Sequence, residues 1–341
     1  MDDDRARARA QLNMLVFSGK AAKVVSVAAE LSIADHLAGG PKDVASLAAD
    51  TETFAPSLRR LLRALAALGF VIDGEDGRFS ETPLLYWLRA DVPGSVRTIA
   101  IMVETQPHDR AWNDLLHSIR TGETAIDHAY GMGIFDFYGK EPEPAAVFNQ
   151  AMTQITAGVA PGVVDAFDFS RFATIVDVGG GHGQLLAAIL AATPGARGIL
   201  FDQPDVVEGA GETLRAAGVA DRVEIVGGSF FDSVPAGADA YVMKSILHDW
   251  NDEASIRILS NCRTAMDPQG RVIVIDRNMA EHITPDPMNV SGTLMDLNMH
   301  ALTGGLERTE AEWRSLFDRA GLALVAATPT QNPMSVIEAR V

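Results

Sequence analysis

The chain has 341 residues, of which 47% are hydrophobic and 21% are charged, and its formal net charge is −17. At roughly 100–200 residues per domain, this length predicts two domains with sizeable cores. The acidic balance and the lack of a long basic run argue against nucleic acid as the main partner. The single cysteine, Cys262, excludes an internal disulfide framework and a thiolate zinc cluster.

The beginning of the chain shows no sign of a secretory signal. Met1-Asp-Asp-Asp-Arg5 is charged and lacks the apolar segment of such signals. No uninterrupted apolar run approaches the ~18–20 residues of a membrane span. We therefore expect a cytoplasmic protein without a membrane partner.

The first hundred residues are predicted to be mostly helical, with one hairpin. Apolar spacing predicts three helices and two strands, over Ala21–Leu37, Val44–Ala49, Pro56–Leu68, Phe70–Ile72 and Arg78–Ser80. The glycines Gly74 and Gly77 between the two strands are typical of a hairpin turn. This order indicates a winged helix in residues 1–100. The acidic charge of the chain favours a dimerisation role for it over DNA binding.

Residues 101–160 are predicted to form a helical connector rich in Met, Trp and Phe side chains, most of which ordinarily fill a core. Pro142-Glu143-Pro144 and Pro161-Gly162 are expected to break this region. The second break marks the start of the last predicted domain, residues 161–341.

From residue 171 onward, strands and helices alternate. The predicted strands are Thr174–Val178, Gly198–Asp202, Val223–Val226, Ala240–Met243 and Arg271–Asp276, and the predicted helices are Gln184–Ala192, Val206–Ala217 and Asp252–Ala265. Short β-rich runs separated by helices predict an α/β fold, a Rossmann-like, doubly wound parallel sheet. Ligands of such sheets bind at the carboxyl ends of the strands.

A glycine-rich segment, Asp177-Val-Gly-Gly-Gly-His-Gly183, follows the first of these strands and opens a helix. Its glycines let the backbone come close to a ligand. The dinucleotide fingerprint needs a further glycine where Gln184 stands, and the Asp177 carboxylate would repel a pyrophosphate. The pattern therefore favours a ligand with positive charge. Asp202, at the end of the second strand, is well placed for a ribose diol.

Four blocks carry a family resemblance: Val176–Gly183, Phe201–Pro204, Lys244–Trp250 and Gly304–Thr309. In these blocks, their order and approximate spacing, the chain resembles the S-adenosylmethionine (SAM)-dependent O-methyltransferases of the caffeate and hydroxyindole type, including bacterial members from secondary metabolism. The resemblance covers nearly the whole chain. It implies a Rossmann-like methyltransferase domain preceded by a winged-helix dimerisation domain. It also implies a homodimer, SAM as cofactor with S-adenosylhomocysteine (SAH) as product, and a small aromatic substrate.

The resemblance also implies a set of cofactor-binding residues. These are Asp177, Gly179, Gly181, Gly183, Asp202, Ser229, Phe230 and Lys244. The family usually has an aspartate near the adenine amine where this chain has Ser229. We therefore expect a weaker adenine contact and a lower cofactor affinity at this position.

For catalysis, the resemblance implies that His248 is a general base and that Asp276 and Glu307 orient it. An imidazole can take a phenolic proton as the oxygen attacks the sulfonium methyl group. A nearby carboxylate fixes the tautomer and stabilises the imidazolium that forms. We therefore expect methyl transfer to a hydroxyl of a small phenolic metabolite.

The acceptor pocket is expected to combine the helical connector with a helix before Glu307. The implied lining residues are Trp112, Phe148, Met152, Asp249, Met295, Asn298, Met299 and His300. His300 is unusual, because bacterial relatives commonly carry an aliphatic residue there. It can contact the acceptor, serve as a structural histidine, or join His248 and Asp249 in a metal site. The metal belongs to an alternative function, C-methylation of an activated aromatic or arylpyruvate carbon, whereas the leading interpretation has none.

Three other classes of function are weighed against this one. A ligand-binding winged-helix regulator is disfavoured by the intact set of His248, Asp276 and Glu307. A nicotinamide-dependent oxidoreductase is disfavoured by Gln184 and Asp177. A non-catalytic partner draws slight support from Ser229. Independently of the function, the apolar helices from Gln11 to Leu37 are expected to pack against a second copy of the chain.

Overall fold

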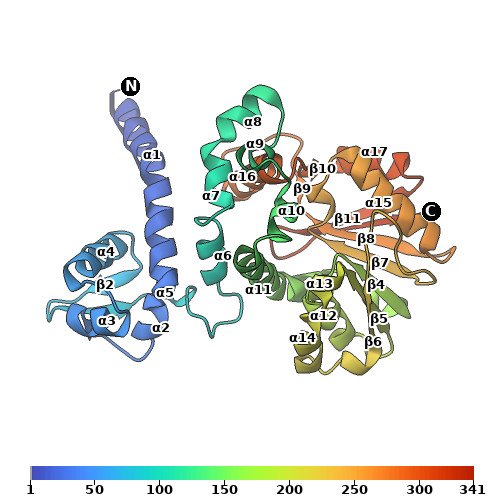
Figure 1. Cartoon of the computed structure of the whole chain (residues 1–341). Coiled ribbons are helices and arrows are strands. Elements are labelled where there is room, and N and C mark those ends of the chain that lie inside the picture. Colours follow the sequence, from blue (N-terminus) through green and yellow to red (C-terminus); the bar gives the residue numbers. More distant parts are fainter. Residues whose placement is uncertain (1) are drawn as a thin grey trace. The chain divides into compact units, whose positions relative to one another are not determined.

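The computed structural model describes residues 2–341, with side chains from residue 4 onward, and divides into two compact units, Met1–Asp109 and Arg110–Val341 (Figure 1). We refer to them as the N-terminal unit and the C-terminal unit. Each has a hydrophobic core of its own.

The N-terminal unit has the predicted winged-helix order. Its elements are α1 (Asp2–Glu30), α2 (Ile33–Leu37), β1 (Lys42–Asp43), α3 (Val44–Asp50), α4 (Ala55–Ala67), β2 (Val71–Asp73), β3 (Arg78–Glu81), α5 (Pro83–Tyr86) and α6 (Arg97–Met102). The three strands form an antiparallel sheet in the order β1-β3-β2. The predicted hairpin is thus present, and α3 and α4 begin within one residue of their predicted starts.

The single helix predicted over Ala21–Leu37 is instead two helices. Ser32 has a left-handed backbone (φ 54°), which ends α1 at Glu30 and lets α2 begin at Ile33. The guanidinium of Arg97 stabilises this corner, since it donates to Ser32 Oγ at 2.6 Å and to Asp35 Oδ2 at 2.9 Å. The break therefore depends on a residue far away in the sequence.

The first half of α1 carries an exposed apolar face. Its members are between 58% and 73% exposed: Leu12, Met14, Leu15, Val16 and Phe17. By length and composition alone, Asp4–Glu30 would be long and apolar enough to cross a membrane, although Lys20 and Lys23 interrupt the apolar run. An apolar face of this kind normally has a partner.

The C-terminal unit is an α/β fold, as predicted. After α7 (His108–Asn113), which spans the boundary between the units, its helices are α8 (Leu115–Thr121), α9 (Ala125–Tyr130), α10 (Ile134–Tyr138), α11 (Pro142–Ala166), α12 (Gln184–Ala192), α13 (Pro204–Val207), α14 (Ala210–Ala216), α15 (Asp252–Ala265), α16 (Pro287–Leu302) and α17 (Glu310–Arg319), with short 3-10 turns at Phe169–Arg171, Ala220–Arg222 and Leu247–Asp249. Its strands are β4 (Thr174–Val178), β5 (Arg197–Asp202), β6 (Val223–Gly227), β7 (Ala240–Lys244), β8 (Arg271–Asp276), β9 (Asn278–Met279), β10 (Arg308–Thr309), β11 (Ala323–Pro329) and β12 (Ser335–Arg340).

Two predictions about helices of the C-terminal unit are wrong. The helix predicted over Val206–Ala217 is divided into α13 and α14. Pro161-Gly162 does not break the chain, because α11 continues through both residues to Ala166. Burial of Val159 and Val163 against the sheet outweighs the hydrogen bond that a proline removes from a helix. Residue 161 is therefore no break between compact units, since the chain divides into them between residues 109 and 110.

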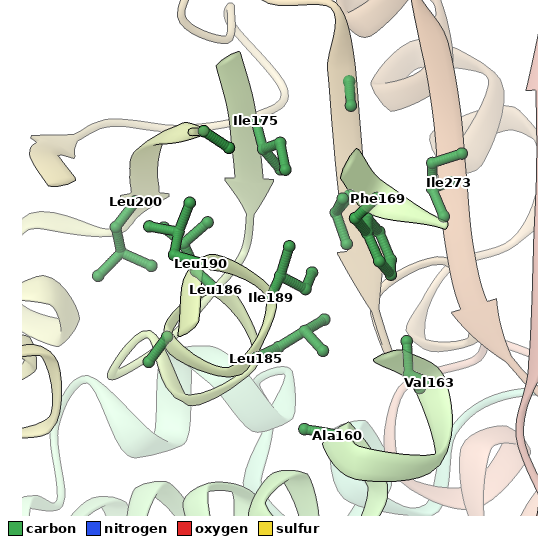
Figure 2. Close-up of a cluster of buried hydrophobic side chains, with 14 of the residues drawn as sticks. Ala160, Val163, Phe169, Ile175, Leu185, Leu186, Ile189, Leu190, Leu200 and Ile273 are labelled. Atoms are coloured by element: carbon green, nitrogen blue, oxygen red, sulfur yellow. The ribbon is translucent and has the colours of Figure 1, made fainter. Parts of the chain in front are cut away.

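Seven strands form the central sheet, in the order β11-β12-β8-β7-β4-β5-β6. The strands from β4 to β8 are parallel, and β12 is antiparallel to both of its neighbours. Apolar side chains of α11, α12 and α14 cover one face of the sheet, and those of α15 and α17 cover the other. Figure 2 shows α12 on the first face, with Leu186 and Leu190 facing Leu200 and Leu185 facing Val163.

The strand order reverses at β4, which lies between β5 and β7. The helix that follows β4 (α12) and the helix that follows β7 (α15) therefore lie on opposite faces of the sheet, and a crevice opens at the carboxyl ends of these two strands. The glycine-rich segment follows β4, and the segment with His248 follows β7. The fold thus brings the two predicted parts of the site to adjacent strand ends.

Candidate active site

The loop after β4 takes its shape from glycines. Gly179, Gly181 and Gly183 have φ angles of 70°, 57° and 76°, a region that side chains disfavour. A Cβ atom at Gly180 would lie 2.5 Å from Leu200 Cδ1. The backbone N–H of Gly181 donates to Asp202 Oδ2 at 2.8 Å. This hydrogen bond ties the loop to the end of β5, so that two predicted cofactor contacts form one unit.

Asp177, near the end of β4, is a buried carboxylate with one unpartnered oxygen. It is 2% exposed, and its Oδ2 atom has no hydrogen-bond partner among the described residues. Burial, together with the charge of Asp202, raises the pKa of Asp177 to about 7. A buried carboxylate of this kind is stabilised by a cationic or hydrogen-donating group. The site therefore suits a ligand with a positively charged nitrogen.

The residues predicted beside the adenine lie next to this loop. A Cβ atom at Gly179 would be 3.6 Å from the ring of Phe230. Ser229 Oγ accepts a hydrogen bond from the backbone N–H of Phe231 at 3.3 Å, so Ser229 closes a short turn. Lys244 donates to Ser245 Oγ at 3.0 Å, and burial lowers its pKa despite the charges of nearby carboxylates.

His248 lies among three carboxylates. Its Nδ1 atom is 3.0 Å from Glu307 Oε1 and 3.9 Å from Asp276 Oδ1, and its Nε2 atom is 3.8 Å from Asp249 Oδ1. The structure therefore brings together all three residues predicted for catalysis. Within the described residues, only Glu307 makes a hydrogen bond with the imidazole, and both carboxylate oxygens of Asp276 lack a hydrogen-bond partner.

The charges of this cluster shift the pKa values of its members. Burial alone lowers the pKa of His248, but its three carboxylate neighbours outweigh burial and raise it to about 9. Burial raises the pKa of Asp276 to about 7 and that of Asp249 to about 6. The site therefore stabilises an imidazolium at this position, which is the form that a general base reaches when it accepts a proton.

The segment Gly304–Thr309 places Glu307 against the histidine. A Cβ atom at Gly305 would lie 2.0 Å from the carbonyl oxygen of His248, so only glycine fits there. The backbone N–H of Glu307 donates to Asp296 Oδ1 at 2.9 Å. Sequence reasoning missed Gly305 and Arg308, although both stand in the block that carried the family resemblance.

Several residues predicted to line the acceptor pocket contact one another. The indole N–H of Trp112 donates to Asn298 Oδ1 at 2.8 Å, and Asn298 Nδ2 is 3.8 Å from Met295 Sδ. Phe148 stacks on Tyr138, with ring centroids 4.6 Å apart. Tyr138 was missed by the sequence analysis, although it is buried and close enough to Asp249 for that charge to add to the burial that raises its pKa.

The remaining predicted residues differ in their surroundings. Met299 is buried, whereas Met152 is half-buried on α11. His300 Nε2 is 3.4 Å from the backbone carbonyl of Ser118. Among the residues that the structure describes, no group of three His, Cys, Asp or Glu side chains is arranged to hold a metal ion. This geometry favours the structural interpretation of His300 over its role in a metal site with His248.

Three features fit the class of SAM-dependent methyltransferases: a doubly wound sheet, a glycine turn beside a buried acid with one unpartnered oxygen, and a buried histidine after the neighbouring strand. Comparison with known protein families agrees with this class and narrows it to the O-methyltransferases. An O-methyltransferase domain model matches residues 112–323, and an O-methyltransferase dimerisation domain model matches residues 14–90. The chain belongs to the O-methyltransferase family.

Individual relatives cover almost the entire chain. A phenazine O-methyltransferase of Lysobacter antibioticus is 46% identical over 314 residues, which are 92% of this chain and 91% of that protein. The structure of the mitomycin 7-O-methyltransferase MmcR has a TM-score of 0.91 at 39% identity and covers 100% of this chain and 99% of its own.

A third relative was solved with ligands. It is an O-methyltransferase from neocarzinostatin biosynthesis in complex with SAM and 2-hydroxy-5-methyl naphthoic acid. Its TM-score is 0.80 at 34% identity, with 94% of this chain and 96% of that chain covered. Family membership and the solved complexes establish SAM as the cofactor, in agreement with the prediction.

Proposed function

We propose that this enzyme transfers the methyl group of SAM to a hydroxyl of a small aromatic metabolite, with His248 as the general base. One observation carries the proposal. Glu307 engages Nδ1 of the buried His248 at 3.0 Å, and the described residues give Nε2 no hydrogen bond. Nε2 is therefore the nitrogen that can accept a proton from an acceptor hydroxyl.

The cofactor would be held at the ends of β4, β5 and β7. The glycine loop would surround its methionine portion, Asp177 would face its amino group, and Asp202 would accept from its ribose hydroxyls. Phe230 and Lys244 would lie beside the adenine. SAM supplies an electrophilic methyl group on a sulfonium. The Oδ2 atom of Asp177, which has no hydrogen-bond partner among the described residues, supports this arrangement, since it suits a cationic ligand.

During transfer, His248 would take the proton of the acceptor hydroxyl at Nε2. Glu307 would keep the imidazole in the tautomer with a proton on Nδ1, and the buried Asp276 would stabilise the imidazolium. The neutral imidazole is the active form of a base, and its carboxylate neighbours favour the charged form. We therefore expect the transfer rate to rise with pH as His248 loses its resting proton.

The acceptor is proposed to be a flat, hydroxylated aromatic. Support comes from the aromatic and thioether side chains that the family resemblance implies for the pocket, which include Trp112, Phe148 and Met152. The naphthoic acid ligand of the neocarzinostatin relative is of the same chemical class. The contact of His300 with the carbonyl of Ser118 supports a structural role for this histidine over the metal site of the alternative, C-methylation.

We also propose a homodimer located in the cytoplasm. The family model of the dimerisation domain matches residues 14–90, which include most of α1. The second copy would bury the exposed apolar face of this helix. Exposed apolar side chains also stand on α8, at Leu116 and Ile119, and on α16, at Met288, Val290 and Leu294. Sedimentation at micromolar concentration should show a dimer, and a monomer would contradict this part of the proposal.

The first experiment is calorimetric titration of SAH into chelator-treated protein, with NADH as the comparison ligand. Micromolar binding of SAH alone is expected. A panel of phenols is then assayed with SAM, and product NMR distinguishes transfer to oxygen from transfer to carbon. Absence of SAH binding, or a C-methylated product, would overturn the proposal.

A further inference from the structure

Arg308 is a fully buried arginine whose contacts lie on the loop that carries His248. It is 0% exposed, and its guanidinium carbon is 5.3 Å from the ring centroid of Trp313. Nη1 donates to the carbonyl oxygen of Leu247 at 2.9 Å, and Nη2 donates to that of Trp250 at 3.0 Å. These two carbonyls belong to the residues that flank His248 and Asp249.

Two further residues, Asp252 and Ser255, hold the guanidinium in place. Nε and Nη2 both donate to Asp252 Oδ1, at 3.2 and 3.0 Å, and Nη2 also lies 3.3 Å from Ser255 Oγ. A planar guanidinium presents five donors in a fixed geometry, so it can join several acceptors at once. A lysine ammonium cannot reproduce this arrangement. The set of partners is therefore specific for arginine.

The neighbour of Arg308 in the chain is Glu307, which binds the imidazole itself. Two consecutive residues thus control the base: Glu307 holds its side chain at 3.0 Å, and Arg308 holds the backbone on both sides of it. Both follow a segment packed so closely that a Cβ at Gly305 would meet the His248 carbonyl. The short 3-10 turn Leu247–Asp249 depends on these remote residues, because one turn has few backbone hydrogen bonds of its own.

We propose that Arg308 is a positioning residue for the catalytic base: it clamps the carbonyls of Leu247 and Trp250 so that His248 stays within reach of Glu307. This inference deepens the proposed function and depends on it. Loosening the clamp should move the imidazole away from its carboxylate neighbours, Asp249, Asp276 and Glu307. The imidazole would then bind its proton less tightly and would be less well aligned with the acceptor. The cofactor loop after β4 would be unaffected.

Arg319 offers a matched control. It binds the same Asp252, at 2.7 Å through Oδ2, and it also pairs with Glu253. Among the described residues, its side chain contacts no carbonyl of the loop with His248. Arg319→Lys therefore perturbs the shared ion pair without touching the clamp, whereas Arg308→Lys keeps a positive charge and removes the bridging geometry.

The experiment measures kcat, KM for the acceptor, SAH affinity and the pH profile of kcat for both variants. For Arg308→Lys we expect a 10- to 100-fold loss in kcat, SAH affinity within threefold of the wild type, and an acidic limb of the profile shifted to lower pH. Arg319→Lys should match the wild type in all four. Equal behaviour of the two variants, or an unshifted profile for Arg308→Lys, would overturn the clamp.

A second variant covers the case in which Arg308→Lys fails to fold, as judged by circular dichroism and SAH binding. Asp252→Asn weakens the anchor of the guanidinium while leaving Arg308 in place. It should shift the pH profile in the same direction by a smaller amount, and an unshifted profile would overturn the proposal. Turnover by His248→Ala would instead refute the base assignment itself, so the two failures are distinguishable.

Discussion

The glycine loop (residues 179–183) and the base loop (residues 245–250) lie at neighbouring strand ends, after β4 and β7. The glycine loop is shaped by backbone conformation, with three positive φ angles and one hydrogen bond to Asp202. The base loop is shaped by side chains from elsewhere, since Glu307 and Arg308 reach it across about sixty residues of sequence. One loop is encoded locally and the other is held in place by a remote segment.

The two loops also differ in their electrostatics. Beside the glycine loop, the buried Asp177 has an oxygen without a hydrogen-bond partner in the described residues. In the base loop, His248 is surrounded by negative charge at 3.0 to 3.9 Å. The first region is thus suited to receive positive charge from a ligand, whereas the second stabilises positive charge on the protein. This division suits an enzyme that binds a cationic cofactor and generates an imidazolium.

The largest effect is expected from His248→Ala. Loss of a general base typically slows catalysis by 10² to 10⁴-fold, and we expect a loss of about 10³-fold in methyl transfer. SAH affinity should remain within about threefold of the wild type, because the glycine loop is intact. Single-turnover assays and calorimetry measure the two quantities. His282→Ala, at an exposed position, is the control. Retained turnover by the first variant would contradict the base assignment.

A pair of glycine substitutions tests the two kinds of loop directly. In Gly305→Ala, the new Cβ would meet the His248 carbonyl at 2.0 Å, so the base loop must shift. We expect a loss of stability on the order of 3 kcal/mol and a drop in kcat of at least tenfold. In Gly181→Ala, no atom lies within 4 Å of the Cβ, and only the φ of 57° is strained. This backbone strain should lower the free energy of unfolding by about 1 kcal/mol.

Urea unfolding and kinetics at saturating SAM compare the two glycine variants. Gly181→Ala should keep a kcat near that of the wild type and bind SAH a few-fold more weakly. The reverse pattern, with kcat reduced only in Gly181→Ala, would show that the base loop does not depend on its contact with Gly305.

The same contrast explains how much of the molecule the sequence predicts. The ranges predicted for β4, α12, α15 and β8 are confirmed to the residue, because apolar periodicity and glycine punctuation are local signals. The glycine loop could be read from its own residues. The contacts of Gly305 and Arg308 could not, since they arise only when β10 pairs with β9 next to the base loop. The left-handed Ser32, held by Arg97, escaped prediction for the same reason.

The buried charge of Asp177 should appear in the pH dependence of stability. Its folded pKa of about 7 lies above the ordinary value of 3.8, so the folded protein holds this proton more tightly than the unfolded chain does. Stability is therefore lost as pH rises from about 4 through 7. Asp177→Asn abolishes this loss, and it should stabilise the cofactor-free protein by on the order of 3 kcal/mol more at pH 8 than at pH 5.

Urea titrations at both pH values measure this difference for Asp177→Asn. The exposed Asp318→Asn serves as the control and should show no such dependence. SAM affinity at pH 8 should fall in the Asp177 variant, because a cationic nitrogen would lose its partner. Equal stabilisation at both pH values would show that this carboxylate is not strained in the folded protein.

The smallest effect is expected from Ser229→Asp, which introduces the acid that the family carries near the adenine. Ser229 is exposed, and its Oγ accepts from the backbone N–H of Phe231, a role that a carboxylate oxygen can also fill. The substitution therefore costs little in folding and adds an acceptor for the adenine amine. SAH affinity should rise by up to about tenfold, or about 1.4 kcal/mol. Ser229→Asn keeps the shape without the charge and should gain less. If calorimetry finds both variants within twofold of the wild type, this turn does not hold the adenine, and cofactor affinity depends on the glycine loop and Asp202 alone.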